Sequence, residues 1–283
     1  MLTCYDYTTA RLLSAAGVRA FLVGDSAANV ILGYDSTLPI SLEFLIELTA
    51  AVRRGAPDAL VIGDLPFGSY STRQQALKSA ASMVKRSGCD AIKLETGRGH
   101  IGHVQSLADN GVAVVAHLGL RPQSVKLLGG YKSQGKTADE VMRIVDLAHD
   151  LVVAGAAAVL LEAVPGEVAE LLAQLVEVPI IGCGAGPSCH SHVVVLNDIL
   201  GLSDVTPRFA PKLADMASPL QLAARKFIKD IQSRHYPSAE QSYLLSPEQR
   251  AELETEIEQW GLSLSSFSPI KVRPAKAKQE RAK

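Results

Sequence analysis

The stretch Ala91-Ile92-Lys93-Leu94-Glu95 is decisive for the fold, because it is a short, mostly apolar run that ends on a residue able to do chemistry. Four other stretches repeat the pattern and end on an acid or a histidine: Phe21-Leu22-Val23-Gly24-Asp25, Leu60-Val61-Ile62-Gly63-Asp64, Val114-Val115-Ala116-His117 and Val159-Leu160-Leu161-Glu162. Such runs are typical of strands buried on both faces of a parallel sheet. The segments between them are long enough for crossover helices. The repeat therefore predicts an α/β fold, a (β/α)8 TIM barrel, whose active site gathers at the C-terminal ends of the strands.

The composition fits one such barrel and excludes several other classes of protein. The chain has 283 residues, 47% hydrophobic content and a formal net charge of −1, which gives no reason to expect nucleic acid or a membrane surface as partner. No apolar run reaches the ~18 residues of a membrane span, and the start has no signal-peptide pattern. Four cysteines without Cys-x-x-Cys spacing favour a reduced, cytoplasmic setting. We expect one barrel domain with C-terminal helices over residues 1–262 and a basic, disordered tail over residues 263–283.

The remaining strands are placed by shorter signals. Leu2-Thr3-Cys4 is expected to be the first strand and 179–183 the seventh, while the eighth is expected near 208–210. Ser41 is expected to cap a helix that starts at Leu42. The segment from Gly119 to about Thr137 is expected to be a long loop, and loops of this length are usually functional or mobile.

Three acids at successive strand ends indicate a metal site. Asp25, Asp64 and Glu95 would repel one another at a barrel mouth unless a cation lay among them. Ligands that are all oxygen favour a hard divalent metal such as Mg²⁺. The alternative is that each acid only caps the helix after its strand.

Three further residues at strand ends are candidates for substrate chemistry. His117 could hydrogen-bond a substrate oxygen or stabilise an enolate, and Glu162 could act as a base. Lys93 lies two residues before Glu95, so it points to the same side of its strand and could pair with a substrate carboxylate. The structural alternatives are a core histidine, a salt-bridged acid and a lysine in an ion pair with one of the acids.

Two weaker patterns follow the seventh strand. Gly182-x-Gly184-x-Gly186 resembles a phosphate loop but lacks the full G-x-G-x-x-G spacing. A cluster of possible zinc ligands in an expected loop matches no tetrahedral spacing pattern, so we predict that it binds no zinc; its members are Cys183, Cys189, His190 and His192.

Longer strings of residues resemble the ketopantoate hydroxymethyltransferase (3-methyl-2-oxobutanoate hydroxymethyltransferase) family. The most specific are Gly33-Tyr34-Asp35-Ser36-Thr37-Leu38-Pro39 and His117-Leu118-Gly119-Leu120-x-Pro122-Gln123-Ser124. Shorter matches, such as Lys93-Leu94-Glu95 and Gly129-Gly130-Tyr131-Lys132, occur in family order from residue 2 to about residue 245.

The resemblance implies a (β/α)8 barrel of the phosphoenolpyruvate/pyruvate superfamily that assembles as a homo-oligomer, a decamer. It implies transfer of the one-carbon unit of 5,10-methylenetetrahydrofolate to 3-methyl-2-oxobutanoate, which gives 2-dehydropantoate. It further implies that Asp25, Asp64 and Glu95 surround Mg²⁺, with Asp64 also at the bound substrate. Ser26 and Lys93 would bind the carboxylate end of the substrate and His117 its oxygen side, and Glu162 would be the base.

The chain departs from the family pattern at four places. The family's Lys-x-Glu-Gly-Gly reads here with Thr96, a common Asp-Gly-Gln reads His190-Ser191-His192, and a terminal Glu-His-Ser-Phe reads Glu240-Gln241-Ser242-Tyr243. Family members also carry about twenty residues before the first strand, so we expect a native start upstream, or subunit contacts that cover the barrel floor. Two alternatives to the implied function are another 2-oxoacid lyase or mutase of the superfamily and an inactive barrel kept as an assembly partner.

Overall fold

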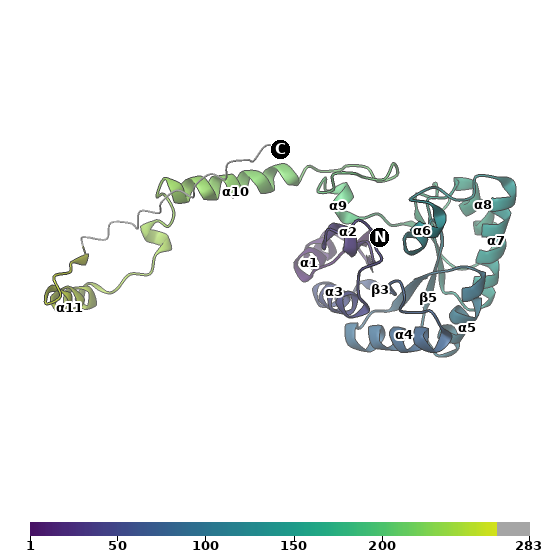
Figure 1. Ribbon diagram of the computed structural model, residues 1–283, viewed down its shortest axis with the longest axis horizontal. Helices are drawn as coiled ribbons and strands as arrows, with labels where there is room; N and C mark the ends of the chain where they lie inside the picture. Colours follow the sequence, from purple (N-terminus) through teal and green to yellow (C-terminus); the bar gives the residue numbers. More distant parts are fainter. Residues whose placement is uncertain (265–283) are drawn as a thin grey trace, which may run out of the picture. The chain divides into compact units, whose positions relative to one another are not determined.

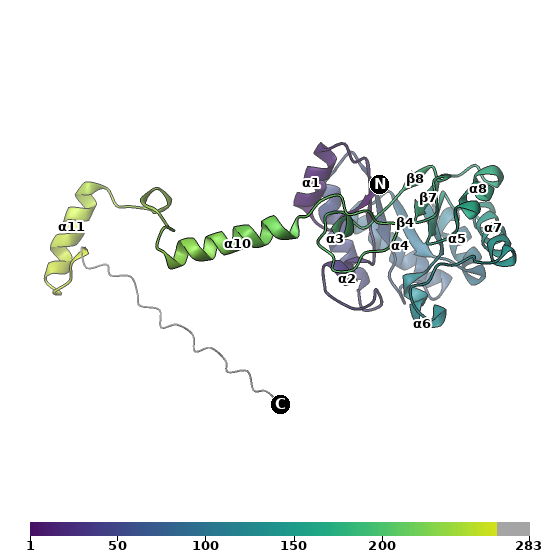
Figure 2. The same cartoon turned by 90° about the horizontal axis from the view of Figure 1, so that it is seen from above.

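The computed structural model describes residues 1–264 and contains one eight-stranded parallel sheet with the strands in sequence order. Neighbouring strands pair in register from β1 to β8, and Thr3 N donates to Val194 O (3.1 Å), which joins the first strand to the segment after the last. The sheet is thereby nearly closed into a barrel with helices outside it (Figures 1 and 2), which confirms the (β/α)8 prediction. The strands are β1 Leu2–Thr3, β2 Ala20–Val23, β3 Leu60–Asp64, β4 Ala91–Glu95, β5 Val114–Gly119, β6 Ala158–Glu162, β7 Ile180–Cys183 and β8 Ser191–His192.

Several helices of the barrel begin where the sequence supplies capping residues. Ser41 Oγ accepts from Phe44 N (3.2 Å) at the start of α3, and Thr72 and Thr137 cap α4 and α7 in the same way. The helices are α1 Tyr7–Ala15, α2 Ala27–Val30, α3 Leu42–Gly55, α4 Arg73–Ser87, α5 Ile101–Asp109, α6 Val125–Leu128, α7 Ala138–Val153, α8 Gly166–Leu175 and α9 Leu196–Ile199, with 3₁₀ turns at η1 Arg98–His100 and η2 Pro122–Ser124.

The strands divide their side chains between two apolar clusters. Alternate residues point outward and pack with the inner faces of the helices, as Ile92 and Leu94 do. The other set fills the barrel interior: Leu22, Ile62, Ala91, Val115, Ala158, Leu160, Ile181 and Val193. Side chains alternate between the two faces of a strand, so every second residue points inward. On several strands the next inward residue is polar. Asp64 follows Ile62, and Glu162 follows Leu160. The polar residues therefore form a layer directly above the apolar interior.

The eighth strand is not where the sequence analysis placed it. Residues 208–210 lie in a turn, and β8 is the two-residue segment Ser191–His192, paired with Ile181 and Gly182 of β7. The prediction was wrong because β8 itself is polar, and its apolar continuation starts only at Val193. His190 and its neighbours are thus at a barrel strand and not in a loop beside the site as expected; Nδ1 of His190 accepts from Ile180 N (3.1 Å).

The chain divides into two compact units, Met1–Pro219 and Leu220–Lys283. The first contains the barrel, and α10 (Ala217–Gln232) begins at its end. The second contains most of α10, the 3₁₀ turn η3 Ala239–Gln241 and α11 Pro247–Glu258. The single domain over 1–262 stays a prediction, and the tail expected at 263–283 lies almost wholly outside the described residues. Among residues 1–264, we find no helix with the length and apolarity that a membrane crossing needs.

Candidate active site

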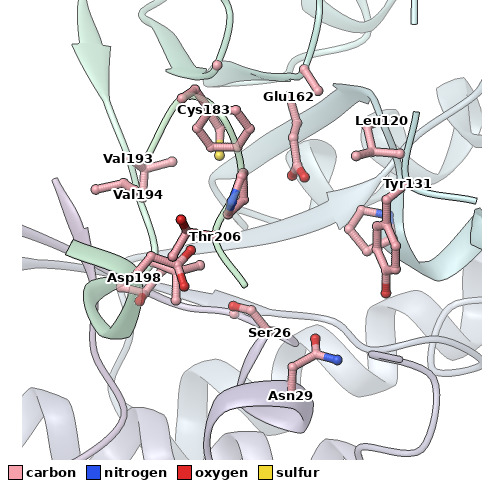
Figure 3. Close-up of a pocket in the computed structure, with 18 of the residues that line it drawn as sticks. Ser26, Asn29, Leu120, Tyr131, Glu162, Cys183, Val193, Val194, Asp198 and Thr206 are labelled. Carbon is pink, nitrogen blue, oxygen red and sulfur yellow. The ribbon is translucent and has the colours of Figure 1, made fainter. Parts of the chain in front are cut away.

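A large pocket of about 1490 Å³ opens at the C-terminal ends of the strands. Five of the predicted site residues line it: Asp25, Ser26, Lys93, His117 and Glu162. Figure 3 shows Ser26 and Glu162 directed into this space, with Tyr131, Asp198 and Thr206 around it. Asp64 and Glu95 lie deeper and are 0% and 3% exposed. The volume is ample for a small acid together with a larger second ligand.

The deepest part of the site is an ion pair between neighbouring strands. Asp64 and Lys93 are opposite each other in the β3–β4 register, and Lys93 Nζ lies 2.9 Å from Asp64 Oδ2. The same oxygen accepts from Asp25 N (2.9 Å), so the backbone of the first acid is tied to the side chain of the second. Asp64 Oδ1 is buried and has no hydrogen-bond partner.

Glu95 shows the same division between its two carboxylate oxygens. Oε1 accepts from Gln123 N (2.9 Å), while Oε2 is buried without a hydrogen-bond partner. Asp25 Oδ2 accepts from Gln123 Nε2 (2.9 Å). Buried polar atoms without partners are rare, and two such oxygens in neighbouring carboxylates need an explanation.

A divalent cation fits these charges. Three carboxylates against the single Lys93 ammonium leave two negative charges uncompensated when all are ionised. Burial, and then the charge of Asp25, raises the pKa of Glu95 to about 9, and burial also raises the pKa of Asp64, although Lys93 opposes that rise. Burial lowers the pKa of Lys93, but the surrounding carboxylates outweigh it, so this pKa stays above its ordinary value and the lysine keeps its charge. A bound cation would stabilise the ionised acids and satisfy the two free oxygens.

The acids do not form a closed metal cage by themselves. Within residues 1–264, no group of three or more His, Cys, Asp or Glu side chains is arranged as a complete ligand set. This is compatible with Mg²⁺, which is commonly held by one or two carboxylates, with water and substrate oxygens completing its shell. The capping alternative is wrong for all three acids, since the N-terminal positions of α2, α4 and η1 belong to Ser26, Thr72 and Gly97.

His117 lies between the lysine and the candidate base. Its Nδ1 is 3.4 Å from Lys93 Nζ, and its Nε2 is 3.3 Å from Glu162 Oε2 but without hydrogen-bond geometry. Burial, and then the charge of Lys93, lowers the pKa of His117, so the ring is neutral. Because an ammonium can only donate, Nδ1 must be the acceptor, and the proton is on Nε2. His117 therefore presents an N–H in the pocket next to the Glu162 carboxylate.

Ser26 lies on the opposite wall of the pocket from Glu162 (Figure 3). Its hydroxyl is 2.8 Å from that of buried Tyr5, which fixes its place at the start of α2. The structure thus brings together all seven residues expected at the site, in a layer built by β2, β3, β4, β5 and β6.

Comparison with known proteins identifies the family. The sequence model of ketopantoate hydroxymethyltransferase matches residues 1–239. The chain belongs to this family. It is 46% identical to the 3-methyl-2-oxobutanoate hydroxymethyltransferase of Acidothermus cellulolyticus over 245 residues, which are 86% of this chain and 90% of that protein. The same enzyme of Thermobifida fusca is 44% identical over 244 residues, 86% of this chain and 87% of the relative. The resemblance found in the sequence is confirmed.

Solved structures with a similar fold are more distant in sequence. Phosphonopyruvate hydrolase has 12% identity and a TM-score of 0.55, with 92% of this chain and 91% of that chain covered. The 2,3-dimethylmalate lyase, a PEP mutase/isocitrate lyase superfamily member, has 16% identity and a TM-score of 0.52, covering 92% and 93%. At this identity they establish the fold alone, a (β/α)8 barrel.

Thr96, one of the departures from the family pattern, has a structural role beside His117. Thr96, where the family has glycine, is 1% exposed, and both its N and its Oγ1 donate to His117 O (2.9 Å each). The substitution therefore adds a tie to the backbone of His117 and leaves the acids in place. The Glu240–Tyr243 string, another departure from the family pattern, lies in the second unit.

The glycines and the possible zinc ligands after β7 have simpler explanations. Gly186 has φ +79°, and a Cβ there would come within 2.6 Å of Gly166 Cα, so it permits close packing of the loop after β7 against the start of α8. Cys183 lines the pocket, and burial raises the pKa of its thiol well above the ordinary value, which makes it a poor ligand. The absence of zinc stays a prediction.

Two residues that the sequence analysis did not single out are central to the site. Gln123 and Tyr70 are 6% and 8% exposed and hydrogen-bonded to each other (2.6 Å). Gln123 lies within the string that carried the family resemblance, but it is a loop residue with no periodic signal, so only the fold reveals its contacts.

Proposed function

We propose that this chain transfers the one-carbon unit of 5,10-methylenetetrahydrofolate to C3 of 3-methyl-2-oxobutanoate. The reaction consumes one water and gives 2-dehydropantoate and tetrahydrofolate. A C3–H bond breaks, a bond from C3 to the methylene carbon forms, and that carbon exchanges its bonds to the folate nitrogens for one to the oxygen of water. The product lies on the route to pantothenate. Membership of the family supports the reaction, and the relatives named above carry this activity in their names.

The observation that carries the proposal is the pairing of Glu162 with His117 above three buried acids. A carboxylate that can remove a proton and a neutral N–H that can bind an oxygen lie 3.3 Å apart. Proton removal next to a carbonyl needs both functions on one substrate.

Asp25, Asp64 and Glu95 are the residues that would hold a divalent cation, Mg²⁺ by the oxygen chemistry of the set. When bound, it supplies Lewis acidity that polarises the keto group and acidifies the C3 proton. The free oxygens of Asp64 and Glu95 support this assignment. A phosphonopyruvate hydrolase of the same fold was solved in complex with oxalate and Mg²⁺.

The residues of the chain have separate roles in the reaction. Lys93 and Ser26 bind the substrate carboxylate, and His117 Nε2–H donates a hydrogen bond to an oxygen of the substrate. Asp64 takes part in holding the substrate through its ion pair with Lys93. Glu162 removes the C3 proton, and the resulting enolate attacks the methylene carbon. The hydrogen bonds of Thr96 to the His117 carbonyl keep the imidazole in place during this step.

The folate, the assembly and the compartment are further parts of the proposal. The pocket volume leaves room for the methylene donor beside the 2-oxoacid. We infer a cytoplasmic homo-oligomer, a decamer, from the family resemblance.

The test is turnover of 3-methyl-2-oxobutanoate by the purified chain with Mg²⁺, with and without 5,10-methylenetetrahydrofolate. We expect formation of 2-dehydropantoate only when the folate is present. Consumption of the 2-oxoacid without folate would indicate another lyase or mutase of the superfamily. No turnover under any condition would favour an inactive barrel.

A further inference from the structure

We propose that Gln123, held by Tyr70, is a positioning residue that orients two of the three site acids toward the metal. This inference rests on the proposed function, because it takes the carboxylates as metal-binding groups. It assigns a task to two buried residues that are not among those lining the pocket.

Gln123 connects four different parts of the barrel. Its side-chain Nε2 donates to Asp25 Oδ2 (2.9 Å) and to Leu65 O (3.0 Å), and its backbone N donates to Glu95 Oε1 (2.9 Å). Its Oε1 accepts from Tyr70 OH (2.6 Å). These partners lie after β2, after β3 and at the last residue of β4, while Gln123 itself lies in η2 after β5. One residue thus joins the ends of four neighbouring strands.

The orientation of the Gln123 amide is determined by its partners. The carbonyl of Leu65 can only accept a hydrogen bond, so the NH₂ group must face it. Burial raises the pKa of Tyr70, so the phenol keeps its proton and donates to Oε1. Both partners therefore select the same orientation, and in this orientation the second Nε2–H points at Asp25. Without them, a flipped amide would place an oxygen against the carboxylate.

The consequence is a fixed direction for each carboxylate. One oxygen of Asp25 and one of Glu95 are occupied by N–H groups of Gln123, and Asp25 N occupies one oxygen of Asp64. The other oxygens of Asp64 and Glu95 are left without partners. Donors behind the carboxylates thus decide which oxygens remain for a cation. Outer partners of this kind commonly change metal affinity 10–100-fold when they are removed.

The experiment measures Mn²⁺ binding by electron paramagnetic resonance of the free ion, with no folate or 2-oxoacid present. In Gln123→Leu we expect affinity for Mn²⁺ to fall about 10-fold or more. Tyr70→Phe removes only the hydroxyl that orients the amide, so a smaller loss is expected. Adding Tyr70→Phe to Gln123→Leu is expected to cause no further loss, because the tyrosine acts through the glutamine.

Controls separate positioning from general loss of structure. Thr49→Val removes another buried side-chain hydrogen bond, from Thr49 Oγ1 to Leu45 O in α3, and is expected to leave Mn²⁺ affinity unchanged. Circular dichroism verifies the fold of each variant. If Gln123→Leu does not fold, Tyr70→Phe alone decides. In turnover assays, the Mg²⁺ concentration for half-activation is expected to rise in Gln123→Leu more than kcat falls at saturating Mg²⁺.

Two outcomes would overturn the inference in distinguishable ways. If wild-type protein binds Mn²⁺ and a folded Gln123→Leu or Tyr70→Phe variant binds it with the same affinity, the positioning role is refuted. The proposed function would still stand. Wild-type protein that binds no Mn²⁺ would refute the metal site of the proposed function, and the role of Gln123 with it.

Discussion

Replacing Lys93 by methionine would remove the only ammonium that faces the three acids among the described residues. Lys93 Nζ lies 2.9 Å from Asp64 Oδ2, and the two side chains are 4% and 0% exposed. With an effective dielectric constant of about 20, the attraction between unit charges at this distance is about 6 kcal/mol. Removing one partner of a buried pair typically costs about 3–5 kcal/mol, because the remaining charge stays buried. Methionine retains most of the lysine stem, so lost packing adds little.

The expected loss is a sizeable fraction of the total stability of a domain, which is about 5–15 kcal/mol. For a domain of about 150–250 residues, 1 kcal/mol shifts Tm by about 2–4 °C, so we expect Lys93→Met to lower Tm by about 6–20 °C. The measurement is thermal denaturation followed by circular dichroism, with excess chelator so that no cation replaces the ammonium.

A matched substitution shows whether the effect belongs to the buried pair. Lys78 is an exposed lysine on α4, and Lys78→Met is expected to change stability by no more than about 0.5 kcal/mol. A Tm of Lys93→Met within 2 °C of wild type would contradict the assignment of a buried ion pair to the centre of the site.

Three further predictions concern the binding of metal ions. Excess EDTA is expected to abolish turnover and Mg²⁺, Mn²⁺ or Co²⁺ to restore it, and full activity in EDTA would contradict a metal role. Asp64→Ala is expected to keep the circular dichroism spectrum of the barrel, since Asp25 and Glu95 still face Lys93. In calorimetry, the same variant is expected to show no joint binding of metal and 2-oxoacid. Unchanged binding heats would show that Asp64 is not part of the metal and substrate site. Purified protein is expected to hold no stoichiometric zinc by elemental analysis, and zinc that disappears in Cys189→Ser would show that prediction wrong.

Periodicity explains why the sequence could indicate that the acids lie in one layer. In a strand buried on both faces, inward residues alternate, so Asp64 must lie above Ile62 and Glu162 above Leu160 once the strand is recognised. The ends of parallel strands in a barrel then meet at one face. These two rules bring residues far apart in sequence into one site without any knowledge of the loops.

The features that were missed depend on contacts that no local pattern encodes. β8 is two polar residues, and its place is defined by pairing with β7. Gln123 is hydrogen-bonded to Asp25, which lies 98 residues earlier in the sequence. The proton on Nε2 of His117 follows only from the position of Lys93 beside Nδ1. Each of these is a tertiary relation between segments whose own sequences allow other structures.

Exchange of the C3 proton of 3-methyl-2-oxobutanoate with deuterated water tests the role of Glu162 most directly. Proton NMR follows the exchange in the presence of Mg²⁺ and without folate, so only proton removal is observed. We expect wild-type protein to catalyse the exchange, and Glu162→Gln, which keeps the shape of the side chain, to bind metal and 2-oxoacid but to lose the exchange. Unchanged exchange in Glu162→Gln would assign the base to another residue, with His117 the first to examine, and would contradict the central claim.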